Sequence, residues 1–174
     1  MTATKKKQPQ KQPENAFPGG GHDHGKCLAR ALDHAETICG ARLTDSRRRV
    51  LELIWRSHAP IGAYEVLDAL RRDKPNAQPP TVYRAIEFLA RHGLVHRIES
   101  RNAFVGCDVY DIDRSHGHGG QFLICRACGA AAEMNDPRIK AAILSSARDA
   151  GFTVGRRTIE VEGLCPNCNG GKER

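Results

Sequence analysis

Residues 80–109 read PTVYRAIEFLARHGLVHRIESRNAFVGCDV, and their pattern changes from helical to strand-like at Gly93. Before Gly93 the apolar residues recur every three or four positions, which predicts an amphipathic helix that begins at a proline. Two strand-like runs follow, Leu94–Glu99 and Ala103–Val109, and Ser100–Asn102 between them predicts a hairpin turn. A helix followed directly by a short hairpin is typical of a winged helix-turn-helix domain.

Three further helices are expected upstream of this stretch. The first spans Cys27–Cys39, the second begins after Thr44, whose hydroxyl can cap it, and the third covers Ala63–Arg72. Residues 1–25 are rich in Lys, Gln, Pro and Gly, so we expect a disordered tail there. We therefore assign residues 26–110 to the winged-helix DNA-binding domain.

A second, smaller unit is expected downstream. Residues 111–120 are polar and Gly-rich and are interpreted as a hinge linker, and residues 121–169 carry the unit itself, followed by a tail at 170–174. The predicted fold class is α+β, with a small α/β dimerisation domain after the winged helix, because so small a unit would leave an apolar face for a second copy to cover. Its expected elements are strands at 121–125, 130–134 and 153–164 and a helix at 137–150, with Ile139, Ala142, Ile143 and Ala147 pointing inward.

The positive charge of the chain is concentrated in one segment. The whole chain carries a net charge of +7. From Gly40 to Arg101 there are 12 Lys or Arg against 7 Asp or Glu, an excess of five, whereas the chain from Asn102 to its end has 9 of each. A basic segment that coincides with a helix-turn-helix pattern indicates a nucleic-acid partner, although a basic face that only keeps a protein in solution has the same charge.

The sequence carries no signal for export or membrane insertion. Residues 1–12 are polar and lack the apolar core of a signal peptide, and no segment is long and apolar enough to span a bilayer. We therefore expect a cytoplasmic protein with no membrane partner. Its seven cysteines would stay reduced there, which favours metal or redox chemistry over disulfides.

Two Cys-x-x-Cys knuckles carry the strongest chemical signal. They are Cys125-Arg126-Ala127-Cys128 and Cys165-Pro166-Asn167-Cys168. Each spacing directs two thiolates at one point, and four thiolates complete a tetrahedral zinc shell with no position open to water. The alternative is a thioredoxin-like redox pair, which would leave the second knuckle unexplained. We predict a structural zinc ion at these four cysteines.

A second, mixed metal site is expected at the domain boundary. His96 and Cys107 lie on the two wing strands, His118 lies in the linker, and Glu133 follows the first knuckle. One thiolate, two imidazoles and one carboxylate suit zinc, while taken singly each residue also fits a surface or core position. His116 competes with His118 for the same place. Two further histidines belong to the tail and fit either a metal site or a merely flexible segment: His22 and His24.

These residues resemble a known family. Pro80-Thr81-Val82-Tyr83-Arg84-Ala85 is similar to the recognition-helix motif of the ferric uptake regulator family, and FLICRACG at 122–129 is similar to its first knuckle. The resemblance runs from about Cys27 to Cys168. Within the family, residues 95–100 and Cys107 are most similar to the zinc uptake regulator branch.

The resemblance implies a function and a ligand assignment. It implies a repressor, not an enzyme, that binds palindromic operators of zinc-uptake genes as a homodimer with zinc as corepressor. It implies two zinc ions per subunit, one structural and one regulatory. The regulatory ion maps onto His96, Cys107, His118 and Glu133. The resemblance also suggests that Asp68 and Arg71 join neighbouring dimers on one operator, whereas their i, i+3 spacing by itself indicates only an intrahelical pair.

The expected DNA contacts follow from the face that the fourth helix leaves exposed. Its apolar stripe packs inward, so Thr81, Tyr83 and Arg84 face outward toward a major groove. Arg84 can bond a guanine through two hydrogen bonds, and Tyr83 can contact a thymine methyl group or a phosphate. Arg47 and Arg101 are expected to contact phosphates.

Three other functions fit parts of the sequence. A thiol oxidoreductase would use Cys125 and Cys128 and would need a free thiol of low pKa. A zinc-ribbon RNA-binding module would need exposed aromatic residues, and aromatic residues are only 5% of the chain. A relative in the same family that senses iron, manganese, nickel or peroxide is the third alternative, and Cys107 favours zinc over it.

Overall fold

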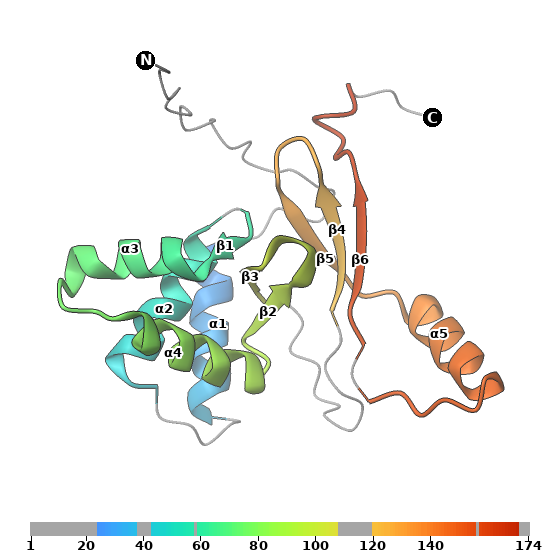
Figure 1. Ribbon diagram of the computed structural model, residues 1–174, viewed down its shortest axis with the longest axis horizontal. Coiled ribbons are helices and arrows are strands. Elements are labelled where there is room, and N and C mark those ends of the chain that lie inside the picture. The colour runs from blue at the N-terminus through green and yellow to red at the C-terminus, as the bar shows by residue number, and fades with distance from the viewer. Residues whose placement is uncertain (1–23, 38–42, 58, 108–119, 156, 171–174) are drawn as a thin grey trace, which may run out of the picture.

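The computed structural model describes residues 24–37, 43–57, 59–107, 120–155 and 157–170. In chain order, the helices are α1 (His24–Thr37), α2 (Asp45–Arg56), α3 (Ala63–Asp73), α4 (Pro79–Arg91) and α5 (Pro137–Asp149). The strands are β1 (Ile61–Gly62), β2 (Val95–Ile98), β3 (Ala103–Gly106), β4 (Gln121–Cys125), β5 (Ala131–Met134) and β6 (Ile159–Gly163), and a 3-10 turn, η1 (Glu99–Arg101), joins β2 to β3. Figure 1 shows the helices α1 to α4 on one side and the sheet of β4, β5 and β6 on the other, with the β2–β3 hairpin between them.

The helices α2, α3 and α4 enclose the larger hydrophobic core. The side chain of Thr44 caps α2 by accepting a hydrogen bond from the backbone N–H of Arg47 at 3.4 Å, as expected from its position. Pro79 occupies the first turn of α4, where a missing N–H costs nothing. The buried residues confirm the helical spacing of the sequence: Val50, Leu51, Ile54 and Trp55 in α2, Val66, Leu67 and Leu70 in α3, and Val82, Ala85, Ile86 and Leu89 in α4.

The hairpin of β2 and β3 forms the wing. Its register pairs His96 with Val105 and Ile98 with Ala103, and the left-handed Asn102, with φ of 47°, completes the turn. A third strand, β1, pairs with β3 and was not expected, because two residues are too few to show a period. Together these elements confirm a winged helix-turn-helix.

The second sheet has the strand order β5-β4-β6. The central strand β4 runs antiparallel to β5 and parallel to β6, with α5 in the connection to β6. The expected strand over Thr153–Leu164 is too long, since only Ile159–Gly163 pairs with β4. The α+β class with a small α/β unit after the winged helix is confirmed.

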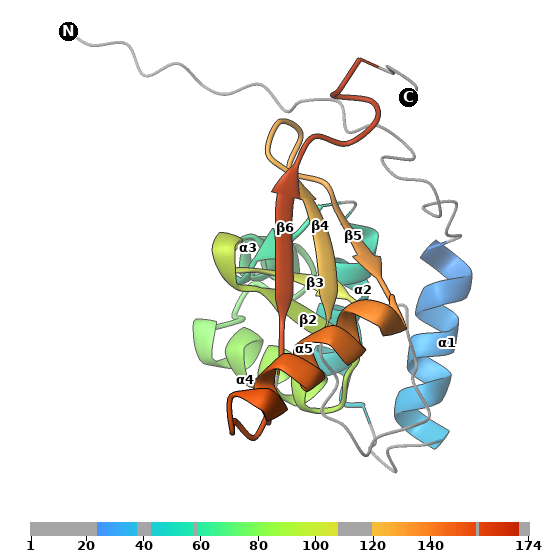
Figure 2. The same ribbon diagram turned by 90° about the vertical axis from the view of Figure 1, so that its right-hand side faces the viewer.

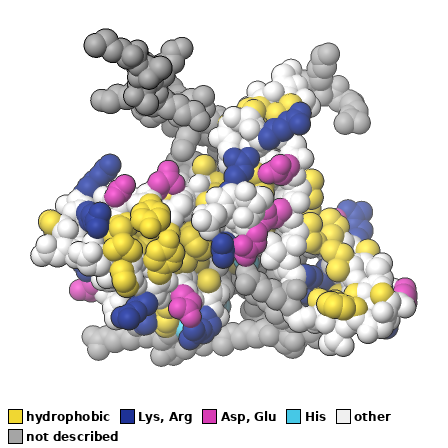
Figure 3. Space-filling view, viewed as in Figure 1, with side chains coloured by type: hydrophobic (Ala, Val, Ile, Leu, Met, Phe, Trp, Pro, Cys, Tyr) yellow, Lys and Arg dark blue, Asp and Glu magenta, His cyan; other side chains and the backbone are white. Residues whose placement is uncertain are grey.

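The helix α5 has no buried residue. Asp136 caps its first turn by accepting a hydrogen bond from the N–H of Arg138 at 2.8 Å. The expectation that Ala142 points inward is wrong: Ala142 is exposed, while Ile143 is half-buried. Hydrophobic side chains remain visible on this side of the molecule (Figure 3), and Phe152, just after α5, is 68% exposed. A single copy therefore leaves apolar surface uncovered here.

Several sequence expectations fall outside the described residues. These are the linker with His116 and His118, most of the tail at 1–25 including His22, and Cys39. The helix α1 begins at His24, two residues before the expected start of the domain. None of the helices within the described residues has the length and apolar composition needed to span a bilayer.

Candidate metal centres and nucleic-acid interface

The two cysteine knuckles lie side by side because their strands are parallel neighbours. Cys125 ends β4 and is paired in register with Gly163 at the end of β6, so the turns that follow both strands leave the sheet at the same edge. Each turn closes on its first cysteine: the N–H of Gly129 donates to the carbonyl of Cys125, and the N–H of Cys168 donates to that of Cys165, both at 2.9 Å. Gly129 has a φ of 78°, a conformation that favours glycine.

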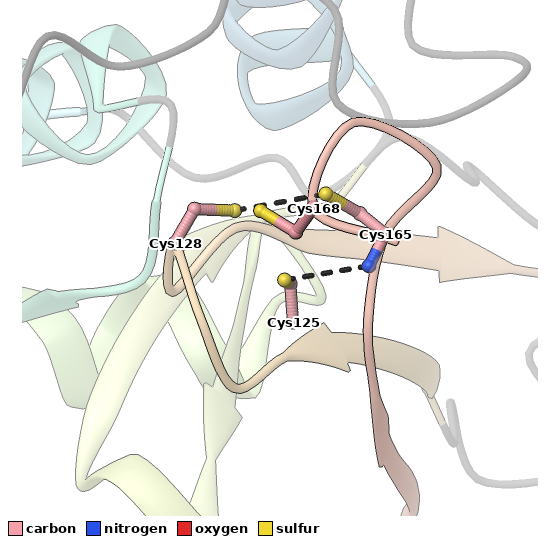
Figure 4. A group of neighbouring side chains, drawn as sticks. All are labelled: Cys125, Cys128, Cys165 and Cys168. Carbon is pink, nitrogen blue, oxygen red and sulfur yellow. Dashed lines mark hydrogen bonds between the residues drawn. The ribbon is translucent and has the colours of Figure 1, made fainter. Parts of the chain in front are cut away.

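The four sulfur atoms are arranged as a metal site requires. They all lie within 4.8 Å of one another, and the Sγ atoms of Cys128 and Cys165 are 3.8 Å apart (Figure 4). A tetrahedral ion with metal–sulfur bonds of about 2.3 Å separates its sulfur ligands by about 3.8 Å, so the donor set fits zinc. The two knuckles could therefore hold one zinc ion between them.

Backbone N–H groups and neighbouring sulfur atoms shift the pKa values of cysteines in this cluster. Burial raises the pKa of the Cys125 thiol, but hydrogen bonds from the backbone of Cys128, Cys165 and Ala127 outweigh burial and lower that pKa to about 6. The N–H of Cys165 lies 3.4 Å from the Sγ of Cys125. In contrast, the Cys165 sulfur, burial and the other two sulfurs raise the pKa of Cys168 to about 12. The backbone thus stabilises the thiolate of Cys125, whereas the neighbouring sulfurs disfavour a charge on Cys168.

A second cluster joins the wing to the other sheet. His96 on β2, Cys107 just after β3 and Glu133 on β5 place their ligand atoms within 4.8 Å of one another. The Nε2 of His96 lies 3.2 Å from the Oε1 of Glu133, close to the about 3.4 Å expected between nitrogen and oxygen ligands of one tetrahedral zinc ion. His96 is 6% exposed and Cys107 is fully buried. These three predicted ligands are brought together, and the fourth, His118 or His116, lies outside the described residues.

The surroundings of this second cluster keep its side chains in place. The ring of His96 packs edge-on against Phe122 of β4, with ring centroids 5.3 Å apart. The N–H of Cys107 donates to the carbonyl of Leu94 at 3.1 Å, which extends the β2–β3 ladder to the cysteine. Next to it, a Cβ on Gly106 would overlap the indole of Trp55, so only glycine fits there. The cluster therefore sits on a wing that packs tightly against α2.

The exposed face of α4 presents the residues expected to contact DNA. Tyr83 is 48% exposed, Arg84 is exposed and Thr81 is half-buried. On the same helix, Arg91 pairs with Glu87 at 2.8 Å. The structure thus places the predicted triplet at the surface, on the first half of α4.

The three arginines at the start of α2 have different surroundings. The guanidinium of Arg47 lies over the ring of Phe88, 3.6 Å from its centroid, and therefore beside α4. Arg48 pairs with Glu36, and Arg49 pairs with Glu52 and Asp73. Arg47, which is expected from the sequence to contact a phosphate, therefore lies next to the helix that carries Tyr83 and Arg84.

Arg101, which is expected from the sequence to contact a phosphate, has a partner in the second sheet. It lies in η1 at the tip of the wing, and its guanidinium donates to the carbonyl of Cys125 at 3.5 Å. The tip of the wing therefore faces the cysteine knuckle of the second sheet.

Sequence reasoning missed one residue at the same boundary. The carboxylate of Glu160 on β6 accepts hydrogen bonds from the backbone N–H of Glu99 at 2.6 Å and from that of Ser100 at 3.0 Å. In the sequence, Ile159-Glu160-Val161-Glu162 alternates like a strand with one face in solvent, so no local signal distinguishes Glu160 from Glu162.

The chain is similar to known proteins both in sequence and in structure. The chain matches the ferric uptake regulator family over residues 39–162. It is 39% identical over 140 residues to the zinc uptake regulation protein of Escherichia coli strain K12, which covers 79% of this chain and 80% of that protein. The structure is similar to that of a zinc uptake regulator complexed with zinc and DNA, with a TM-score of 0.74, 37% identity and coverage of 86% of this chain and 97% of the other. It is also similar to holo XcZur, with a TM-score of 0.70, 40% identity and coverage of 84% and 99%. The chain therefore belongs to the ferric uptake regulator family.

Proposed function

We propose that this protein is a zinc-responsive transcriptional repressor that acts as a homodimer on palindromic operators of zinc-uptake genes, with zinc as corepressor. Each subunit would hold two zinc ions, a structural one at Cys125, Cys128, Cys165 and Cys168 and a regulatory one at His96, Cys107, Glu133 and His118. The protein would act as a regulator in the cytoplasm rather than as an enzyme.

One observation carries the proposal: the second cluster takes its ligands from both domains. His96 and Cys107 belong to the wing, and Glu133 belongs to the other sheet, yet their ligand atoms lie within 4.8 Å of one another. A zinc ion bound there would cross-link the two domains through its own coordination bonds. The similar proteins that are named as zinc uptake regulators, one of them complexed with zinc and DNA, support zinc as the metal.

The position of the cluster supports a direct link to DNA binding. β2 follows α4 after only three residues, so a wing held in place fixes the direction of α4 as well. Holding both α4 helices of a dimer in a fixed orientation removes an ordering cost before DNA binds, because two grooves must be met at one spacing. Metal and DNA then favour the same arrangement, and each strengthens binding of the other.

Individual roles at the DNA follow from exposure and charge. Arg84 would bond a guanine edge through two hydrogen bonds, Tyr83 would contact a thymine methyl group or a phosphate, and Thr81 would contact the backbone at the start of α4. Arg47, held over Phe88 beside α4, would contact a phosphate. Such contacts make the affinity dependent on salt.

The second subunit would dock on the side of the molecule that carries α5 and β6. The exposed apolar residues around α5 and β6, including Phe152 and Val161, would be covered by the second subunit. Asp68 and Arg71 lie 4.0 Å apart on the surface of α3, and in the proposed assembly they would contact a neighbouring dimer on the same operator.

A metal titration tests the function. The full-length protein would be stripped of metal, supplied with one zinc equivalent, and mixed with a palindromic promoter fragment while free zinc, iron or manganese is raised. We expect zinc to increase DNA affinity at sub-micromolar free concentration. Activation by iron or manganese, without activation by zinc, would overturn the assignment in favour of another member of the family.

A further inference from the structure

Three cross-strand neighbours in the second sheet contact the wing. Phe122 on the central strand β4 pairs in register with Glu133 of β5 on one side and with Glu160 of β6 on the other. Residues directly opposite each other on adjacent strands project from the same face of a sheet. Glu133, Phe122 and Glu160 therefore form one line across the sheet, on the face toward the wing.

The strand β2 lies along this line. His96 contacts Glu133 at 3.2 Å, Ile98 forms a small buried cluster with Phe122, and the N–H groups of Glu99 and Ser100 donate to Glu160 at 2.6 and 3.0 Å. Figure 2 shows the β2–β3 hairpin behind the second sheet, running across its strands.

The spacing of the two elements matches. Strands in a sheet lie about 4.8 Å apart, so Glu133 and Glu160 are separated by about 10 Å across β4. A strand rises about 3.3 Å per residue, so His96 and Glu99 are also about 10 Å apart along β2. The wing is thus held at two points by carboxylates from the two outer strands.

We infer that Glu160 is a positioning residue that fixes the direction of the wing, and through it of α4, while the metal cluster at Glu133 fixes the other end of the same strand. This inference rests on the proposed function. A wing attached only at His96 can turn about that attachment, whereas a second attachment about 10 Å away prevents the turn. Glu160 therefore affects the increase in DNA affinity that metal binding produces, and it does not affect the affinity for the metal.

The chemistry of the contact suits this role. The first N–H groups of a 3-10 turn have no partner within the turn, and a carboxylate can accept from two of them at once. Burial raises the pKa of Glu160, but hydrogen bonds from Ser100 and Glu99 outweigh burial and lower that pKa, so the group is charged at neutral pH. Arg101 in the same turn donates to the carbonyl of Cys125, which holds the turn at a third place.

The test compares Glu160→Gln with Glu162→Gln in the full-length, zinc-loaded protein. Glu162 lies on the same strand and on the same face, is exposed, and takes no part in the hydrogen bonds to Glu99 and Ser100, so its variant removes the same charge and leaves those bonds in place. Glutamine has the shape of glutamate but only one acceptor oxygen, so an effect of Glu160→Gln does not arise from packing. Glu160→Ala, which removes both acceptors, completes the series.

Three readouts separate positioning from metal binding. Amide hydrogen exchange at Glu99 and Ser100 measures the cap, that is, the two hydrogen bonds from these N–H groups to Glu160. Zinc titration followed by the fluorescence of Trp55, the only tryptophan, measures binding at the second metal site. Binding to a palindromic fragment measures DNA affinity. We expect Glu160→Gln to exchange faster at both amides, to keep its zinc affinity and to lose DNA affinity by about tenfold, the usual size of a coupling between sites. Glu160→Ala should lose more, and Glu162→Gln should match the wild type.

Two results would overturn the inference. One is wild-type protection of both amides in Glu160→Gln, which would show that the cap does not form. The other is unchanged DNA affinity in a variant whose amides exchange faster. A wild-type protein that does not respond to zinc would instead contradict the proposed function, and the exchange data would still show whether Glu160 holds the wing.

Discussion

His96 and Glu133 face each other across the boundary between the two sheets, with the imidazole Nε2 3.2 Å from the carboxylate Oε1. They come from strands that share no hydrogen bond, β2 of the wing and β5 of the second sheet. Both side chains are nearly buried, with exposures of 7% and 11%. This buried pair lies next to the sulfur of Cys107, and its two members belong to different domains. Metal binding at this site would therefore fix the relative position of the two domains.

Replacing Cys107 with serine should weaken the regulatory site and leave the fold intact. The hydroxyl is a poor zinc ligand, so we expect zinc-dependent DNA affinity to fall by about tenfold to a hundredfold. Metal analysis should still find one tightly bound zinc ion per subunit, and the protein should melt cooperatively. Full DNA affinity in this variant would remove Cys107 from the regulatory site.

Replacing Cys165 with serine should instead remove the structural zinc ion and unfold the second sheet. This cysteine of the second knuckle is fully buried, and a structural zinc site contributes its binding free energy, about 10–16 kcal/mol in small zinc domains, to folding. We expect loss of tightly bound zinc and of the cooperative melting transition of the second sheet in circular dichroism.

Alkylation of the wild type is the matching measurement. The four knuckle thiols should resist alkylation until a strong chelator removes the metal. Rapid modification of Cys125 and Cys128 in untreated protein would instead favour a thiol oxidoreductase.

Arg84 should contribute to the discrimination between the operator and unrelated DNA. In Arg84→Ala, binding to the operator should weaken by about 1–3 kcal/mol, while binding to unrelated DNA changes little, because a guanine contact is specific. Arg91→Ala is the matched control, since Arg91 is exposed on the same helix and paired with Glu87. Equal losses in both variants, measured by fluorescence anisotropy, would argue against a base contact by Arg84.

Arg47 should act on affinity without regard to sequence. Arg47→Ala should weaken binding to operator and to unrelated DNA alike, and the slope of log K against log salt should fall by about 0.9, the value for one phosphate contact. Arg48→Ala serves as the control, because Arg48 is already paired with Glu36. An unchanged slope in Arg47→Ala would place Arg47 away from the DNA.

The sequence predicted the parts of the molecule that depend on local patterns. The buried faces of α2 and α4 follow from apolar spacing, and the cap at Thr44 follows from one hydroxyl before a helix. It also grouped His96, Cys107 and Glu133, because their chemistry is unusual at a domain boundary. Such features need no knowledge of which strands pair.

The features that sequence could not supply depend on long-range pairing. β1 has only two residues, and the role of Glu160 arises because β6 pairs in parallel with β4 and thereby faces the wing. The position of Arg101 follows from the same docking, which brings the wing tip to Cys125. In each case the deciding partner is distant in the chain.

The most direct test of a zinc site shared by the two domains is diffraction from the zinc-loaded full-length protein at wavelengths on both sides of the zinc absorption edge. We expect two anomalous peaks per subunit, one within the four knuckle sulfurs and one within about 2.0–2.3 Å of His96 Nε2, Cys107 Sγ and a Glu133 oxygen. A single peak at the knuckles, with His96 and Cys107 remote from any metal in protein that binds its operator, would contradict the shared site.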